Sequence, residues 1–381
     1  MGRLSSTSSC KVVVVGAGIV GAAVAEALVE DGHVVTLVDQ GPPGAGATAA
    51  GMGHVVVMDD SPAQIALTGY SQRLWDARSP GLPAAAERMV CGTLWIAADD
   101  EEMVEVRRKA HFYHLQGVAA EVLDAARLYA KEPHLRPGLA GGLLVPGDSV
   151  VYPPPIAAAM ADVVRQRGGE VLLGKTVTSM SGREVKLADG TAMECDFTVN
   201  AAGAQAAALC PGFDIRPRKG HLLITDRYPG YVRHQLVELG YLKAAHETTE
   251  ASVAFNVQPR PTGQLLIGSS RQYGANAPGV DHQILRRMLD RAIEYMPVLA
   301  GLSAIRVWTG FRAATPDKLP LIGPHPDDSR LILAAGHEGL GITTSLGTAA
   351  LVADCLAGRV PAIPLEPYLP ARFLTGVTHA G

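Results

Sequence analysis

One stretch near the N-terminus, residues 11–39, constrains the fold more than any other part of this sequence. It reads KVVVVGAGIVGAAVAEALVEDGHVVTLVD. A run of four valines leads into a glycine-rich turn, an apolar-periodic helix follows, and a second valine-rich segment ends at Asp39. This succession predicts a βαβ unit of the kind that binds dinucleotides.

Three glycines and one acid give this unit its chemistry. Gly16 permits the tight turn between strand and helix, Gly18 lets a pyrophosphate approach the backbone, and Gly21 allows the helix to pack closely on the sheet. The N-terminus of the helix offers free N–H groups and a positive dipole end to the phosphate. Asp39 can accept hydrogen bonds from a ribose diol, which favours FAD or NAD over NADP. The simpler alternative is a glycine-rich turn that serves packing alone.

Composition excludes several other classes of protein. The chain has 381 residues, enough for two domains, and it is 48% apolar and 18% charged, so it can form large cores. A net charge of −4 without a basic cluster argues against binding to nucleic acid. The five cysteines are scattered and form no CxxC pair, which indicates reduced thiols in a cytoplasm and no metal site. The N-terminus lacks the apolar region of a signal peptide, and no apolar run is long enough to span a bilayer.

The remaining pattern predicts two interleaved domains. A helix over residues 61–78 has Ser61 as its N-cap and Pro62 in its first turn. The glycine-rich segment 41–53 is predicted to be irregular backbone lying against a cofactor. Strands are predicted over 88–97 and again well beyond the first unit, at 219–225, 252–257, 264–268 and 304–313. No linker separates these strands from the first unit, so the chain is expected to cross between the domains several times.

Five motifs occur in a fixed order along the chain. They are GAGIVG with Asp39, GATAAGMG at 46–53, VNAAGA at 199–204, GFRAATPDKLPLIG at 310–323 and AAGHEGLGITTSLGTA at 334–349. Together they resemble the FAD-dependent D-amino acid oxidase and glycine oxidase family over most of the chain. The resemblance implies an α/β fold, with a Rossmann-type (GR2-like) FAD-binding domain interleaved with an α+β substrate domain built on an antiparallel or mixed sheet. The expected division is residues 10–87, 151–218 and 306–381 for FAD, and 88–150 and 219–305 for substrate.

The same resemblance implies non-covalent FAD, because no cysteine precedes the TPD segment. The adenylate half is expected on the first unit and the flavin beside GATAAGMG and GHEGLGIT, where the helix N-terminus would stabilise the reduced flavin. His337 can equally serve only to bond within its own turn. The expected cofactor residues are Gly16, Gly18, Ile19, Val20, Gly21, Asp39, Gln40, Thr48, Ala49, Gly51, Gly53, Val177, Ala201, Ala202, Gly203, Gly310, His337, Gly339, Leu340, Gly341, Ile342 and Thr343.

Arg312 is the residue that the resemblance assigns to substrate. A guanidinium fork binds an α-carboxylate in two-point fashion and so directs Cα–H at flavin N5. The alternative for Arg312 is a surface arginine, or one paired with Asp317. His54, Asn256 and Tyr241 are further pocket candidates, each with ordinary packing as its alternative.

The reaction that the resemblance implies is oxidation of a C–N bond by hydride transfer to flavin N5, which gives an imine. The amino-acid sequence of residues 48–68 and 311–323 most resembles that of bacterial D-hydroxyproline dehydrogenases. This resemblance suggests cis-4-hydroxy-D-proline or D-proline as the substrate. Glycine, sarcosine, other D-amino acids and opines remain open, as do 2-hydroxy acids. An NAD-dependent enzyme and a subunit that only relays electrons are the rival classes. The electron acceptor is not specified by the sequence, so electron-transfer subunits, a membrane electron chain and oligomers are all compatible with it.

Overall fold

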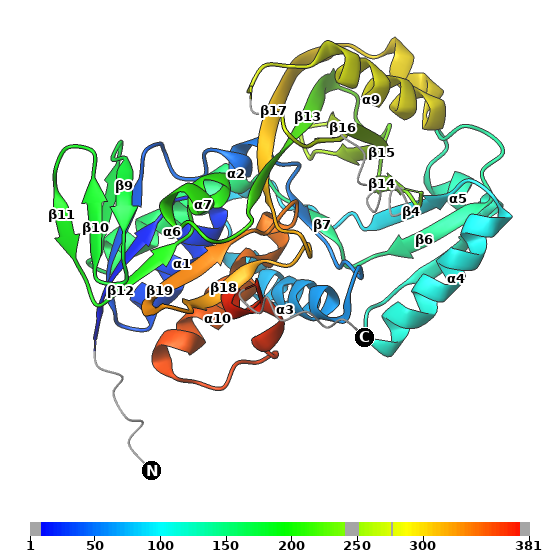
Figure 1. Cartoon of the computed structure of the whole chain (residues 1–381). Coiled ribbons are helices and arrows are strands. Elements are labelled where there is room, and N and C mark those ends of the chain that lie inside the picture. Colours follow the sequence, from blue (N-terminus) through cyan, green and yellow to red (C-terminus); the bar gives the residue numbers. More distant parts are fainter. Residues whose placement is uncertain (1–8, 241–250, 276, 374–381) are drawn as a thin grey trace, which may run out of the picture.

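The structure is a computed structural model that describes residues 9–240, 251–275 and 277–373. Its first sheet has six strands, of which five are parallel and the edge strand β18 is antiparallel (Figure 1). In spatial order these are β18 (Leu321–His325), β19 (Asp328–Ala335), β12 (Phe197–Asn200), β1 (Lys11–Val15), β2 (Val34–Asp39) and β8 (Glu170–Leu173). The parallel β1–β2 pair and the intervening helix confirm the predicted βαβ unit.

The alternating valines of β1 pack against two different layers. Val12 and Val14 face a core shared with helices, whereas Val13 and Val15 face a core shared with a small meander. The helices are α1 (Ile19–Glu30), α6 (Pro153–Gln166), α10 (Gly341–Ala357) and α3 (Pro62–Arg78). The meander contains β9 (Val177–Met180), β10 (Glu184–Leu187) and β11 (Ala192–Glu194). The six-stranded sheet is therefore covered on both faces, as expected of a largely parallel sheet.

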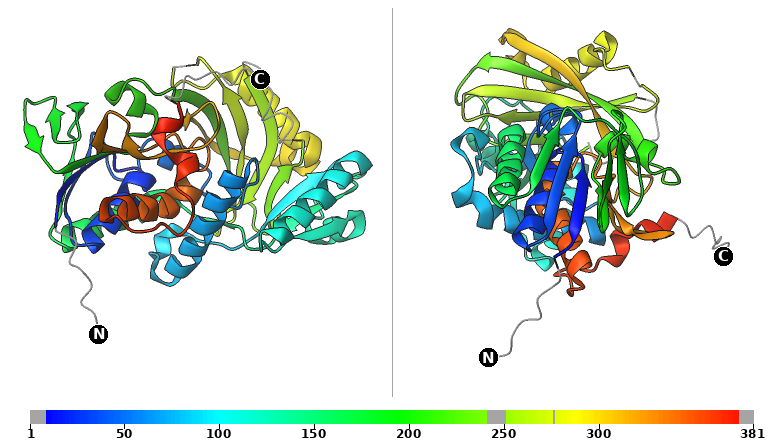
Figure 2. Two further views of the ribbon diagram at one scale, coloured as in Figure 1. Left: turned by 60° about the horizontal axis from the view of Figure 1, so that its bottom comes forward. Right: turned by 90° about the vertical axis from the view of Figure 1, so that its left-hand side faces the viewer.

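A second, mixed sheet has eight strands. In spatial order these are β17 (Ala304–Ala314), β13 (Arg216–Arg227), β16 (Gln264–Gln272), β15 (Ala251–Pro259), β14 (Gln235–Glu238), β4 (Thr93–Ala97), β6 (Gly141–Val145) and β5 (Glu121–Asp124). Its outer face packs on α9 (His282–Tyr295) and α5 (Ala125–Lys131). Strands β4, β6 and β5, at one edge of the sheet, also pack on α4 (Asp100–Leu115). Figure 2 shows this sheet arching over the six-stranded one.

Several short elements connect the two sheets. A strand pair is formed by β3 (His54–Val55) and β7 (Ser149–Val150), and α7 (Ala206–Leu209) follows β12. The segment predicted to be irregular instead contains one helical turn, α2 (Ala47–Ala50), whose sequence ATAA has three alanines, the strongest helix formers. The strand predicted over 88–97 begins only at Thr93, after an isolated bridge between Met89 and Val150.

Two helices begin at residues whose side chains cap the helix N-terminus. Ser61 accepts a hydrogen bond from the backbone N–H of Gln64 at 3.1 Å, and Pro62 is the first residue of α3, as predicted. Asp99 caps α4 in the same way through Glu102. By contrast α10, which begins at Gly341 after Leu340, has no side-chain cap. Its first N–H groups are therefore available to another partner.

Candidate functional site

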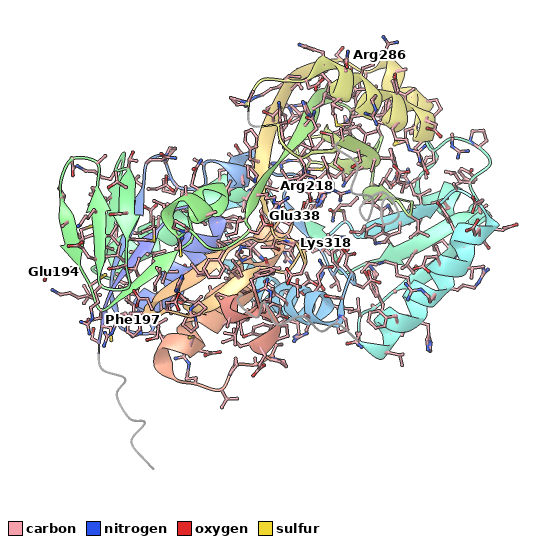
Figure 3. All side chains as sticks on the ribbon, viewed as in Figure 1. Glu194, Phe197, Arg218, Arg286, Lys318 and Glu338 are labelled. Atoms are coloured by element: carbon pink, nitrogen blue, oxygen red, sulfur yellow. The ribbon has the colours of Figure 1, made fainter. Side chains whose placement is uncertain are left out.

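A cavity of about 1010 Å³ lies between the two sheets and is lined by residues from both. The glycine-rich turn of β1–α1 and the start of α10 form one wall, and strands of the eight-stranded sheet form the other. Figure 3 shows three labelled charged residues that line the cavity, Arg218, Lys318 and Glu338, near the middle of the molecule, whereas Arg286 lies on the outer helix α9.

The glycines of the first turn have different structural reasons. Gly16 has φ of +108°, and a Cβ there would lie 2.4 Å from the carbonyl oxygen of Ala201. A Cβ on Gly21 would lie 1.8 Å from the carbonyl oxygen of Gly16, so Gly21 keeps the helix against the turn. Gly18 is less confined, with the Thr48 hydroxyl 3.2 Å from such a Cβ, and it lines the cavity. A glycine there lets a ligand approach the backbone.

Asp39 lies at the end of β2 with its carboxylate at the cavity edge. One oxygen accepts a hydrogen bond from Ala17 N at 2.6 Å and the other from Gly41 N at 2.7 Å. A carboxylate has about four lone-pair sites, so two of them stay open to a diol. The Thr48 hydroxyl accepts a hydrogen bond from Ile19 N at the start of α1, at 3.0 Å. The turn, the helix start and this acid fit the diphosphate and ribose of a dinucleotide.

Most of the expected cofactor residues line this one cavity. Those that line it are Gly16, Gly18, Ile19, Val20, Asp39, Gln40, Thr48, Gly51, Gly53, Val177, Ala201, Ala202, Gly203, Gly310, His337, Gly339, Leu340, Gly341 and Ile342. Three do not. Gly21 packs against the turn, Ala49 is exposed on α2, and Thr343 is buried behind the start of α10.

Close backbone approaches narrow the other end of the cavity. A Cβ on Gly310 of β17 would lie 2.4 Å from Ala50 Cβ, so β17 passes directly against α2. The start of α10 is anchored by Thr343, whose hydroxyl donates to His54 O at 2.9 Å and accepts from Val56 N at 3.3 Å. The uncapped N-terminus of α10 therefore opens on the cavity in a fixed position, which suits the pyrimidine edge of a flavin.

His337 forms a buried contact with this helix. Its Nε2 lies 3.0 Å from the Thr348 hydroxyl, and burial lowers the pKa of His337 to about 3. The imidazole is therefore neutral at ordinary pH. His337 also lines the cavity. Its position is therefore compatible with both expectations, a hydrogen bond that only stabilises the local structure and a contact with the cofactor.

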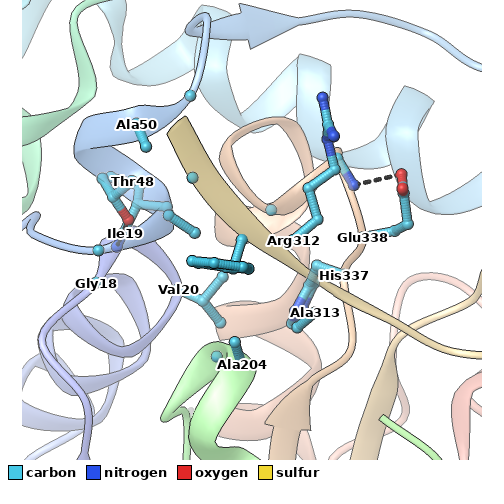
Figure 4. A pocket seen from close by; sticks show the side chains of 18 of the residues that line it. Gly18, Ile19, Val20, Thr48, Ala50, Ala204, Arg312, Ala313, His337 and Glu338 are labelled. Carbon is cyan, nitrogen blue, oxygen red and sulfur yellow. Dashed lines mark hydrogen bonds between the residues drawn. The ribbon is translucent and has the colours of Figure 1, made fainter. Parts of the chain in front are cut away.

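Arg312 lies on the cavity wall formed by β17. Its Nη1 donates to the carbonyl oxygen of Ser270 at 3.0 Å. A Cβ on Gly220 would lie 2.5 Å from the same nitrogen, so the guanidinium lies directly over the bare backbone of β13. Figure 4 shows Arg312 at the same end of the cavity as His337 and Glu338. Asp317, the alternative partner considered for Arg312, forms an ion pair with Arg372 at 2.7 Å.

Glu338 and two further arginines were not identified from the sequence. Arg218 Nη1 donates to Glu338 Oε1 at 2.7 Å, and both residues line the cavity with Arg271. Burial alone would raise the pKa of the Glu338 carboxyl, but nearby guanidinium groups outweigh it and lower the pKa below its ordinary value. These groups belong to Arg312, Arg218 and Arg271. The positive φ of Glu338, 51°, is a signal that only the structure supplies.

The other pocket candidates are placed as follows. His54 lines the cavity, and burial lowers its pKa to about 4, with the charge of Arg312 acting in the same direction. Asn256 on β15 also lines it and is 5% exposed. Tyr241 lies outside the described residues. Within the described ranges, no group of three potential ligands could hold a metal ion, and no helix has the length and hydropathy to cross a membrane.

Residues 11–355 match the sequence profile of a family described as DAO, FAD dependent oxidoreductase. The chain is 27% identical over 385 residues to the glycine oxidase of Geobacillus kaustophilus (strain HTA426), with 95% of this chain and 97% of that protein covered. It is 29% identical over 300 residues to a D-amino acid dehydrogenase of Methylobacterium nodulans, with 74% and 67% covered. The crystal structure of the Geobacillus kaustophilus glycine oxidase has a TM-score of 0.84 at 26% identity, covering 95% of this chain and 98% of that chain.

The family match spans both sheets, and it agrees with a cavity that begins at a dinucleotide turn and ends at an uncapped helix. The expected α/β fold with a mixed second sheet is confirmed, and so is the expected FAD. An NAD-dependent dehydrogenase is excluded by the same match. This chain belongs to the DAO family of FAD-dependent oxidoreductases.

Proposed function

We propose that this enzyme oxidises the Cα–N bond of an amino or imino acid whose carboxylate is bound by Arg312. The observation that carries the proposal is the position of this guanidinium, on a cavity wall beside the glycines Gly310 and Gly339 that were expected to contact flavin. Relatives named glycine oxidase and D-amino acid dehydrogenase support a substrate of this class. A subunit that only relays electrons has no need of a carboxylate-binding arginine.

FAD, held by the glycine-rich turn, Asp39 and the start of α10, would supply an acceptor for the hydride of the substrate Cα; the substrate would become an iminium ion, which loses a proton from nitrogen to give the imine. Arg312 fixes the carboxylate and so directs Cα–H toward the cofactor. His54 is neutral at ordinary pH because burial lowers its pKa to about 4, so it adds no charge to the cavity. Glu338 stays ionised and holds Arg218 at the same end of the cavity. An amine that binds in its neutral form needs no strong base, so positioning is the main contribution of these residues.

Within this class we propose cis-4-hydroxy-D-proline or D-proline as substrate. The support is the similarity of residues 48–68 and 311–323 to bacterial D-hydroxyproline dehydrogenases. Glycine, sarcosine, other D-amino acids and opines are alternative substrates that would also be oxidised at a C–N bond. A 2-hydroxy acid is the alternative that keeps the carboxylate but is oxidised at a C–O bond.

The test is an anaerobic spectral titration of the FAD-loaded protein. Loss of the flavin absorbance with cis-4-hydroxy-D-proline or D-proline is the expected result. Glycine, sarcosine, D-alanine and a 2-hydroxy acid are titrated alongside. Reduction by the 2-hydroxy acid alone would overturn the Cα–N assignment, and a yellow protein that no substrate reduces would overturn the proposed function.

Arg312→Ala tests the carboxylate contact directly. A charge-assisted contact of this kind contributes roughly 1.5–3 kcal/mol, so substrate affinity is expected to fall by about 10- to 150-fold while FAD content is retained. Arg312→Lys keeps the charge but loses the two-point geometry, and its affinity should be intermediate. Unchanged affinity in Arg312→Ala, measured by flavin titration, contradicts the assignment.

Three further features belong to the proposal. FAD is bound non-covalently, which is supported by the absence of cysteine among the described cavity-lining residues. The enzyme works in the cytoplasm, which is supported by five free cysteines. Electrons pass on to an external acceptor, either oxygen or an electron-transfer partner, since the sequence has no cysteine spacing for an iron–sulfur cluster.

A further inference from the structure

The cavity wall formed by the eight-stranded sheet has two chemically different ends. Strands β13, β16 and β17 contribute Arg218, Arg271 and Arg312. The lining residues contributed by β4, β14 and β15 are uncharged among those that the structure describes: Thr93, Trp95, Gln235, Val237 and Asn256. A substrate whose carboxylate binds Arg312 therefore directs its opposite end toward a polar but neutral surface.

Strand register places three side chains of the neutral end in one row. Val237 of β14 pairs with Trp95 of β4 on one side and with Asn256 of β15 on the other. Cross-strand partners point to the same face of a sheet, so the three side chains are neighbours. On its other side Asn256 pairs with Gly268 of β16, and Ser269 follows it and also lines the cavity.

Three polar atoms on this part of the cavity wall, two from the row and one from the neighbouring Ser269, lack hydrogen-bond partners within the described part of the chain. They are Trp95 Nε1, Asn256 Oδ1 and Ser269 Oγ, and all three are buried atoms. The residues are 3%, 5% and 4% exposed. A buried polar group without a partner costs about 1–3 kcal/mol, so three of them on one cavity wall call for a partner that the described residues do not supply.

The types of these atoms select the chemistry of that partner. The Trp95 indole only donates, the Asn256 oxygen only accepts, and the Ser269 hydroxyl does both. A second carboxylate could not donate to Asn256, and an ammonium could not accept from Trp95. A hydroxyl has one donor hydrogen and two acceptor lone pairs, so it satisfies both kinds of group.

The spacing suits a molecule of amino-acid size. Arg312 donates to Ser270 on β16, and Asn256 on the next strand pairs with Gly268, two residues before Ser270. A strand spacing of about 5 Å and a two-residue rise of about 7 Å put these two backbone positions roughly 9 Å apart. A small ring that carries a carboxylate and a hydroxyl at opposite ends, with a hydrogen bond of about 3 Å at each end, can bridge groups at that separation.

We propose that Trp95, Asn256 and Ser269 form a subsite for an uncharged hydroxyl group of the substrate. The subsite makes the enzyme selective for hydroxylated amino or imino acids over their unsubstituted counterparts. This inference rests on the proposed function, which supplies the carboxylate end of the substrate.

The test compares kcat/KM for cis-4-hydroxy-D-proline and D-proline, which differ by the hydroxyl alone. The FAD-loaded wild type should prefer the hydroxylated compound by on the order of 10-fold or more. Asn256→Leu keeps the side-chain size and should lower that preference at least several-fold. Trp95→Phe removes the indole N–H and keeps an aromatic ring under Lys109, whose ammonium lies 4.9 Å from the ring centre, and it should lower the preference too. Thr262→Ala, in the exposed turn between β15 and β16, is the matched control and should leave the preference unchanged.

The outcomes separate the two claims. A wild type reduced equally well by both compounds, or a preference that survives in both variants, overturns the subsite and leaves the proposed function standing. A yellow wild type that no amino or imino acid reduces overturns the proposed function and the subsite with it. If Asn256→Leu fails to retain FAD, Trp95→Phe tests the subsite through the same ratio of kcat/KM for the two compounds.

Discussion

At the scale of single residues, the position of Arg312 depends on a side chain that is missing. Its guanidinium occupies the space that a Cβ of Gly220 would fill, and from there it reaches the carbonyl oxygen of Ser270. The Lys219–Gly220–His221 segment reads from sequence as the start of a strand. Gly220 lies in β13, and it also determines where the guanidinium that we propose to bind the carboxylate can lie.

Gly220→Ala should therefore impair substrate binding more than folding. The atom that its Cβ meets is the far end of a flexible side chain, so the protein can relieve the contact by displacing Arg312. The expected result is a KM raised about 10-fold or more, with FAD content and melting temperature close to those of the wild type. Gly301→Ala, where a Cβ meets nothing within 4 Å, is the control. A normal KM in Gly220→Ala, measured by steady-state kinetics, would show that Arg312 is not confined by this glycine.

The limits of the sequence are visible at the same scale. Arg312 could be identified because it lies inside a recognisable motif. Arg218 and Arg271 lie in strands of ordinary composition, and it is the antiparallel register that pairs Arg218 with Arg312 across β13 and β17. Glu338 lies inside GHEGLG, but its ion pair with Arg218 joins residues 120 positions apart. No local pattern encodes such contacts.

At the scale of elements, α10 combines an open N-terminus with a buried anchor. The helix has no side-chain cap, while Thr343 attaches it to β3 and His337 bonds back to Thr348.

The capped starts of α3 and α4 were predictable because a cap is a local signal. The short strands β14 and β18 were not, because four or five residues owe their strand conformation to neighbours distant in sequence.

The anchor at His337 should make stability depend on pH. Burial lowers the pKa of His337 from 6.5 to about 3, so between these values the unfolded chain binds a proton that the folded chain excludes. Stability is therefore highest above pH 6.5 and falls as the pH drops toward 3, by about 2 kcal/mol between pH 7.5 and 5 from this residue.

Urea titrations at pH 7.5 and 5 would measure this dependence in the free energy of unfolding. His337→Asn keeps a polar side chain near Thr348 without a titrating group, and it should lose about that much less stability on acidification than the wild type. His54 contributes in the same direction, since its pKa is also lowered, and so the variant should retain part of the dependence. An identical loss in both proteins would mean that His337 is protonated in the folded state.

At the scale of the whole molecule, the cavity belongs to both sheets. The turn after β1 contacts one side of it and β17 the other, and the chain crosses between the sheets several times. The proposed division into FAD-binding and substrate-binding domains places residues 306–381 with FAD, yet β17 spans Ala304–Ala314 within the eight-stranded sheet. A strand of one sheet thus carries both Gly310, expected at the cofactor, and Arg312, expected at the substrate.

Because residues from both sheets line one cavity, FAD should stabilise both together. A ligand at 100 times its dissociation constant adds about 2.7 kcal/mol to the state that binds it. Hydrogen exchange measured by mass spectrometry, with and without FAD, should show added protection in residues 16–21 and 336–342 and also in residues 309–313. Residues 121–131, which contribute nothing to the described cavity lining, serve as the internal control and should exchange alike in both samples. Protection confined to the six-stranded sheet would mean that β17 joins the site only when substrate binds, so that Arg312 would be positioned by the substrate and not in advance of it.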